Sequence, residues 1–85
     1  MPDHTKHPLL EALKIAKASP NGLPMQIQNT VKEIAESSSE IERSRKASEV
    51  SRWLYAECAN PGIDQFTVMG YTALRNALAA YIPEN

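Results

Sequence analysis

The segment from residue 24 to residue 59 carries two apolar stripes that point in different directions. An α-helix turns about 100° per residue, so apolar residues on one face recur every three or four positions. The first stripe comprises Ile27, Val31, Ile34 and Ile41, and the second comprises Ala47, Val50, Leu54 and Cys58. On one continuous helix the two stripes lie roughly 180 to 200° apart. One straight helix therefore cannot press both stripes onto one core.

Two structures satisfy this pattern. Either the chain breaks near Ser37-Ser38-Ser39 and folds back, or one helix of about 34 residues serves two cores on opposite sides, one of them supplied by a second chain. Serine favours the break, because it caps helix N-termini well and fits helix interiors poorly. The stretches 37–40 and 39–42 both match the capping-box pattern of Ser followed three residues later by Glu. However, no Gly or Pro from Met25 to Asn60 forbids a continuous helix.

Helices are also predicted on both sides of this segment. Pro8 suits the first turn of a helix whose apolar face comprises Leu9, Leu10, Leu13 and Ala16. The sequence 19–22 predicts a tight turn, and Pro24 opens the next helix. Residues 60–62 end the helical pattern of the central segment, and Asp64 caps a last helix. The apolar face of the last helix comprises Tyr71, Leu74, Leu78 and Tyr81, supported by Met69, Ala77 and Ile82.

The expected fold is a single all-α domain, a small bundle of three or four helices. Their ranges are about 8–18, 24–37, 39–59 (or fused with the one before, as a long central helix) and 64–82. Residues 1–7 are expected to form a flexible N-terminal tail. Gly70 is either tolerated inside the last helix or marks a close approach to a neighbouring backbone. No run of alternating β-branched residues predicts a sheet.

Length and composition bound the class of protein. A chain of 85 residues buries only about 60 to 65% of its unfolded surface, so pairing with a second copy would add stability. Hydrophobic residues make up 42% of the chain, the ordinary content of a folded domain. The single cysteine cannot form an internal disulfide, which favours the cytoplasm. We find no export signal and no apolar run near the roughly 20 residues of a membrane span.

Residues that could perform chemistry are few. Asp3, His4 and His7 could share a metal ion, but no fourth ligand lies near and a solvated tail is the better interpretation. Cys58 lies on an apolar stripe and is read as a small core residue, because no base is placed to activate it. The chain lacks the serine-nucleophile elbow, the phosphate-binding loop and the helical zinc motif. We therefore expect no enzyme, no metal and no cofactor.

Charge is arranged in two blocks. The acidic block comprises Glu33, Glu36, Glu40 and Glu42, and the basic block that follows comprises Arg43, Arg45, Lys46 and Arg52. A formal net charge of −1 argues against binding to nucleic acid by bulk charge, although a local basic patch remains open. The plainest interpretation is a solvated helix face with pairs such as Glu42 and Lys46. Trp53 either packs against the last helix or anchors a partner.

The stretch Ala47-Ser48-Glu49-Val50-Ser51-Arg52-Trp53-Leu54 resembles the recognition helices of small phage repressor-like regulators. The resemblance implies that Ser48, Ser51 and Arg52 would face the DNA major groove and that Arg43, Arg45 and Lys46 would hold phosphates. It covers eight residues. Helix-turn-helix proteins place a short turn, often containing glycine, just ahead of the recognition helix, and here a glutamate-rich stretch occupies that place. We therefore do not assign the chain to that family.

The leading prediction is a small cytoplasmic regulatory or adaptor protein that binds another protein through a helical face, as a homodimer. The expected self-association seam comprises Ile27, Val31, Ile34 and Ile41. The expected partner contact comprises Arg43, Arg45, Lys46, Arg52 and Trp53. The alternative is a phage- or plasmid-type DNA-binding transcriptional regulator that uses the basic helix around residues 43–54.

Overall fold

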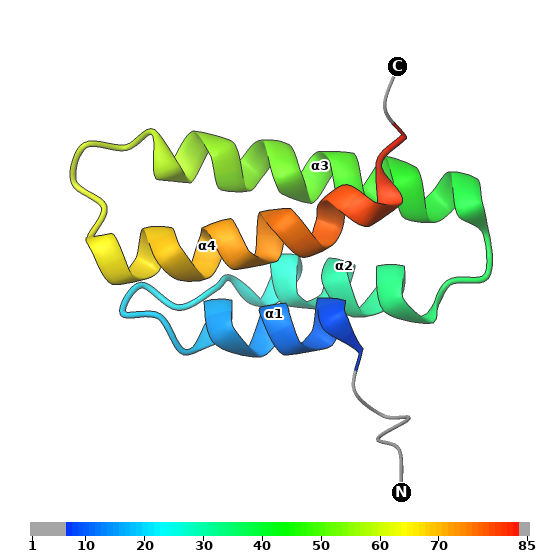
Figure 1. Cartoon of the computed structure of the whole chain (residues 1–85), viewed down its shortest axis with the longest axis horizontal. Helices are drawn as coiled ribbons and strands as arrows, with labels where there is room; N and C mark the ends of the chain where they lie inside the picture. The colour runs from blue at the N-terminus through cyan, green and yellow to red at the C-terminus, as the bar shows by residue number, and fades with distance from the viewer. Residues whose placement is uncertain (1–6, 84–85) are drawn as a thin grey trace, which may run out of the picture.

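The computed structural model of the chain describes residues 7–83 and is all-α, as the sequence predicts. Four helices follow one another, and none of the described residues forms a β-strand (Figure 1). They are α1 Pro8–Lys17, α2 Met25–Glu36, α3 Glu40–Cys58 and α4 Gln65–Leu78, and a short 3₁₀ turn, η1 Ala79–Tyr81, continues α4. The helix ends lie within one residue of the predicted ones, except that α4 ends at Leu78, four residues before the predicted end at 82, and η1 continues it to Tyr81. The central segment forms two helices.

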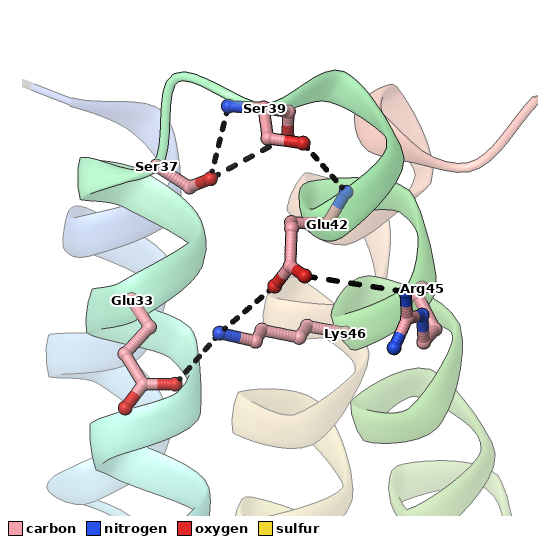
Figure 2. A network of polar contacts seen from close by, with 6 residues as sticks. All are labelled: Glu33, Ser37, Ser39, Glu42, Arg45 and Lys46. Atoms are coloured by element: carbon pink, nitrogen blue, oxygen red, sulfur yellow. Dashed lines mark hydrogen bonds and ion pairs between the residues drawn. The ribbon is translucent and has the colours of Figure 1, made fainter.

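The chain breaks at the predicted serines, so α3 runs back alongside α2 (Figure 1). The Ser39 hydroxyl accepts a hydrogen bond from the Glu42 backbone N–H at 3.3 Å and caps α3. The Ser37 hydroxyl accepts one from the Ser39 N–H at 3.1 Å, where a complete capping box would use the Glu42 carboxylate (Figure 2). Because the chain reverses here, both apolar stripes reach one core, which confirms the first of the two alternatives.

The helices form an up-and-down bundle with the core at its centre. Successive helices run in opposite directions, and each packs against two neighbours, with α1 beside α4 and α2 beside α3 (Figure 1). Within the described residues the two diagonal pairs do not approach each other. All four helices supply fully or nearly fully buried side chains to one cluster. It includes Leu9, Leu13, Ala16, Val31, Ile34, Ala47, Val50, Leu54, Tyr71, Leu74 and Leu78.

Gly70 brings α1 and α4 into backbone contact. A Cβ atom added at Gly70 would lie 3.3 Å from the Ala16 Cα and 3.3 Å from the Ile15 carbonyl oxygen. Both of these atoms belong to the backbone of α1, which cannot move aside as a flexible side chain could. The close-approach interpretation of Gly70 is therefore confirmed.

Hydrogen bonds also fasten the turn between α1 and α2 onto α4. The Asn21 N–H donates to the buried Thr67 hydroxyl at 3.2 Å, and the Tyr71 hydroxyl donates to the Gly22 carbonyl at 2.8 Å. Gly22 has a φ of 65°, the left-handed conformation that glycine adopts without strain.

Asp64 caps α4 as predicted. Its carboxylate accepts hydrogen bonds from the Thr67 hydroxyl and N–H, which lower the pKa of Asp64.

Three details differ from the sequence predictions. Leu10 and Met69 were expected on the core faces of their helices, but they are 37% and 60% exposed. The face that neighbouring helices cover is narrower than the apolar stripe, so both residues fall outside it. His7 was assigned to a tail, but its ring accepts a hydrogen bond from the Leu9 N–H at 3.2 Å and caps α1. The rest of the expected tail, residues 1–6, lies outside the described residues.

Candidate protein-binding surface

The four residues of the expected self-association seam are separated by the fold. Val31 and Ile34 are fully buried in the chain's own core, and Ile27 packs against that core. Ile41 lies beyond the break, in the first turn of α3, and is 74% exposed. A seam through all four residues therefore does not exist as a continuous surface of this fold. The reason is the reversal at 37–39, which turns the first stripe inward.

The five residues of the expected partner contact also separate. Arg43 points towards the bundle, where its guanidinium donates to the Ser37 carbonyl at 2.8 Å and lies 6.0 Å from the centre of the Tyr81 ring. The Ser37 carbonyl is one of the unpaired acceptors at the end of α2, and a cation is favourable there. Arg43 therefore joins three segments of the fold and is not offered to a ligand.

Lys46 bridges two helices. Its ammonium lies 3.0 Å from the Glu33 carboxylate on α2 and 3.5 Å from the Glu42 carboxylate one turn earlier on α3 (Figure 2). The predicted pair of Glu42 and Lys46 is thus confirmed. The hydrogen bond to Glu33 is the main reason that the pKa of Lys46 is raised. Arg45 contacts the same network only at 4.0 Å from Glu42 and is 66% exposed.

Arg45 and Arg52 line an open groove of about 730 Å³ between α3 and the C-terminal segment after α4. They lie two helical turns apart on one face of α3, and Arg52 makes no ion pair with any described residue. The exposed Ile41 lies at the same face, and Tyr81 and Ile82 form the opposite wall. The lining also includes Glu40 and Glu49. The groove therefore combines apolar side chains with charges of both signs.

Trp53 packs against α4 and is only partly buried. Its ring lies 5.7 Å from the ring of Tyr71 on α4, and the side chain is half-buried against the core. The nearby Tyr55 is 60% exposed and is covered on one face by the Arg75 guanidinium, 3.7 Å from its ring centre. The packing interpretation of Trp53 describes its position better than the anchor interpretation. Cys58 is also partly buried against the core.

Sequence reasoning missed a second surface, on α1 and α4. Phe66, Met69 and Ile15 are 71%, 60% and 54% exposed, and they surround a shallow hollow of about 640 Å³ whose floor includes Gly70. We call this the α1–α4 face. One feature of the sequence could have indicated this surface. Phe66 and Ile15 are large apolar residues that lie off the predicted apolar stripes of their helices.

Metal binding and membrane insertion find no support in the described residues. Asp3 and His4 lie outside them, and residues 7–83 contain no group of three potential ligand side chains that could hold an ion. None of the helices in the same range combines the length and apolar content needed to cross a membrane.

Comparisons with protein-family models, with curated proteins and with solved structures each gave no match.

Proposed function

We propose that the chain is a small regulatory or adaptor protein that acts by binding another protein, and not by catalysis. The proposed binding site is the groove between α3 and the C-terminal segment. The observation that supports this function is the placement of Ile41, Arg45 and Arg52 along one groove, all three exposed. An apolar anchor beside arginine is a common composition of the residues that dominate protein interfaces.

The chemistry of the groove suggests the kind of segment that it binds. Arg45 and Arg52 favour a carboxylate on the partner, because guanidinium and carboxylate groups form paired hydrogen bonds. Ile41 and Ile82 favour an apolar side chain next to it. Glu40 and Glu49, which also line the groove, repel further acidic groups. We therefore propose a partner segment that carries one or two carboxylates beside an apolar residue.

Binding to DNA is the alternative proposal. Arg45 and Arg52 are exposed on one face of α3, as phosphate contacts would require. Against this, Arg43 and Lys46 are engaged within the fold. The first turn of α3, where recognition helices contact bases, is acidic. The α2 and α3 helices also lie side by side along the bundle (Figure 1), whereas the two helices of a helix-turn-helix cross steeply.

A display library of random peptides, selected on the immobilised chain, tests the proposal. We expect enriched sequences that combine Asp or Glu with a large apolar residue. Binding of a synthetic enriched peptide should weaken at least about fivefold in each of Ile41→Ser, Arg45→Ala and Arg52→Ala, as expected for contacts worth more than 1 kcal/mol. The matched control is Lys32→Ala, an exposed basic residue of α2 outside the groove, which should leave binding unchanged.

The same variants decide between the two proposals. Mixed-sequence duplex DNA, titrated between about 50 and 200 mM salt, should bind weakly and with little dependence on Arg45 and Arg52. Tight DNA binding that falls steeply with salt and is lost in both arginine variants would favour the regulator of transcription. Enriched peptides that bind all the groove variants equally would contradict the proposed site.

A further inference from the structure

We infer that two copies of this chain pair through antiparallel α3 helices, each lying in the groove of the other, and that this pairing closes the groove to other ligands. The inference rests on the proposed function, because it takes the groove between α3 and the C-terminal segment as the binding surface. It adds what occupies that surface when no other protein is bound. The observation that carries it is the order of the charges along α3.

The charged residues of the groove alternate in sign along one face of α3. In chain order they are Glu40, Arg45, Glu49 and Arg52, and the part of the C-terminal segment that lines the groove adds no charge. All four are exposed, and Glu40, Glu49 and Arg52 form no ion pair with any described residue. Arg45 has only its 4.0 Å contact with Glu42. The groove therefore offers two carboxylates and two guanidinium groups to a ligand.

A ligand that pairs with every one of these charges must present the opposite order of signs. Read from its C-terminal end, α3 presents Arg52, Glu49, Arg45 and Glu40, which is that opposite order. A second α3 that runs antiparallel, centred between residues 46 and 47, brings each guanidinium within one residue of an opposing carboxylate, about 1.5 Å along the axis. Two-fold symmetry then gives each of the two kinds of ion pair twice.

The same register keeps like charges further apart than opposite ones. The nearest like pair is formed by the two copies of Arg45, which are offset by three residues, about 4.5 Å along the axis. The two copies of Glu49 are offset by about 7.5 Å. Attraction therefore outweighs repulsion across this face, and the order of the charges selects a second copy of the chain over a ligand of one sign.

The other charged residues of α3 do not line the groove. Glu42 and Lys46 pair with each other, and Lys46 also pairs with α2. Arg43 donates to the Ser37 carbonyl at 2.8 Å. Glu57 lies near the C-terminal end of the helix, beyond the groove. No further charge from α3 therefore opposes the antiparallel pairing.

The uncharged residues of the face also suit a helix pair. Ser44 and Ser48 line the groove between the charges, and their short side chains let two helices approach closely. Ile41, which is 74% exposed, lies level with the Arg52 of the second copy and packs against its aliphatic stem. The segment Glu40-Ile41 is itself a carboxylate beside an apolar residue, the chemistry proposed above for a ligand of the groove.

The test is sedimentation velocity of the full chain from about 1 to 500 µM in 50 mM salt. We expect a monomer–dimer equilibrium with a dissociation constant in the micromolar range, because one helix pair is a small interface, and weaker dimerisation in 0.5 M salt. Arg45→Glu and Glu49→Arg each place like charges opposite one another and should weaken dimerisation at least about fivefold. Both positions are exposed, so circular dichroism should show both variants as helical as the parent.

Mixing the two single variants is the sharpest measurement. A chain with Arg45→Glu carries two acidic groups where a chain with Glu49→Arg carries two basic ones, so the mixture should dimerise at least as well as the parent. The double variant Arg45→Glu/Glu49→Arg restores both pairs and should also dimerise. A mere loss of folding cannot produce either recovery. The matched control is Lys32→Glu, the same change of charge at an exposed residue of α2, which should dimerise like the parent.

A parent chain that stays monomeric up to 500 µM would overturn the inference, as would single variants that dimerise like the parent or a mixture that stays monomeric. An enriched peptide that binds the intact dimer would contradict closure of the groove, since saturating peptide should convert the dimer to monomer. Glu49→Arg separates the two proposals. It should weaken the dimer without weakening the binding of an acidic peptide, so a monomeric chain that still binds peptide leaves the proposed function standing, and a dimer for which no peptide is enriched leaves only the pairing.

Discussion

The two sides of the bundle are held together by different kinds of contact. On one side, α1 and α4 touch at the backbone through Gly70. The turn between α1 and α2 is also held to α4 by hydrogen bonds with Thr67 and Tyr71. On the other side, α2 and α3 are joined by an exposed serine turn and by ion pairs of Lys46 (Figure 2). Both sides share one core. They differ in how much of their polar bonding is protected from water.

This difference indicates which side of the bundle depends on the identity of individual residues. A side chain at the Gly70 crossing has no room, and a buried hydrogen bond that loses its donor leaves an unpaired acceptor behind. Exposed ion pairs are screened by water and salt and contribute little. The α1–α4 side should therefore be sensitive to single substitutions, and the outer contacts of the α2–α3 side should tolerate them.

The largest effect is expected at the core that both sides share. Val31→Glu places an unpaired carboxylate at a position with 0% exposure. The cost should exceed about 4 kcal/mol, a large part of the stability of a chain this size, so circular dichroism at 25 °C should show an unfolded protein. The control is Lys32→Glu, one residue further along and exposed, which should stay folded. A Val31→Glu chain that remained folded as a monomer would show that α2 does not share the core.

The next effect concerns the crossing of α1 and α4. Gly70→Val should destabilise the fold by about 2 to 3 kcal/mol, because the added atoms meet the backbone of α1. The measurement is the free energy of unfolding in urea. Asn76→Val adds the same side chain at an exposed position of α4 and should cost less than about 1 kcal/mol. Equal losses in the two variants would mean that the close crossing adds no constraint.

A smaller effect is expected at the turn between α1 and α2. Tyr71→Phe removes the donor to the Gly22 carbonyl and should cost about 1 to 1.5 kcal/mol at pH 8 in urea unfolding. Burial raises the pKa of Tyr71 above its ordinary value of 10.0, so the folded state favours the neutral phenol.

This contribution is complete below pH 10 and is lost as the pH rises from 10 through the folded-state pKa. The parent chain should therefore lose more stability than Tyr71→Phe between pH 9 and 11. Tyr55→Phe, at an exposed tyrosine, should match the parent at both pH values.

The smallest effect is expected at the ion pair between α2 and α3. Glu33→Gln removes the partner that lies 3.0 Å from Lys46, but the Glu33 side chain is 57% exposed. The free energy of unfolding should change by less than about 0.5 kcal/mol, and the change should shrink further in 0.5 M salt. A loss above 1 kcal/mol that persists in salt would show that the polar contacts between α2 and α3 contribute as much stability as those between the α1–α2 turn and α4.

Local signals predicted the elements of the fold well. Pro8, Asp64 and Ser39 act at the helix ends where their chemistry suits them, and two divergent stripes required either a reversal or a second chain. The reversal followed from the preference of serine for helix ends, although no Gly or Pro enforced it.

The candidate surfaces could be predicted only in part. A stripe shows which residues of one helix are apolar, but their exposure depends on which neighbours cover them. Val31 and Ile34 are covered, whereas Phe66 and Met69 are not. The roles of the basic residues also depend on which neighbouring helices lie beside them. Arg43 and Lys46 turn to acceptors supplied by α2, which spacing within one helix could not reveal.

The pairing of α1 with α4 has a consequence for synthesis on the ribosome. Gly22 and Tyr71, which join across this pair, lie 49 residues apart in the sequence. At 5 to 20 residues per second, roughly 2.5 to 10 s separate their appearance in the growing chain. During that interval the apolar face of α1 is not yet covered by α4. The nascent polypeptide can therefore bind chaperones or associate prematurely with other nascent copies of the chain.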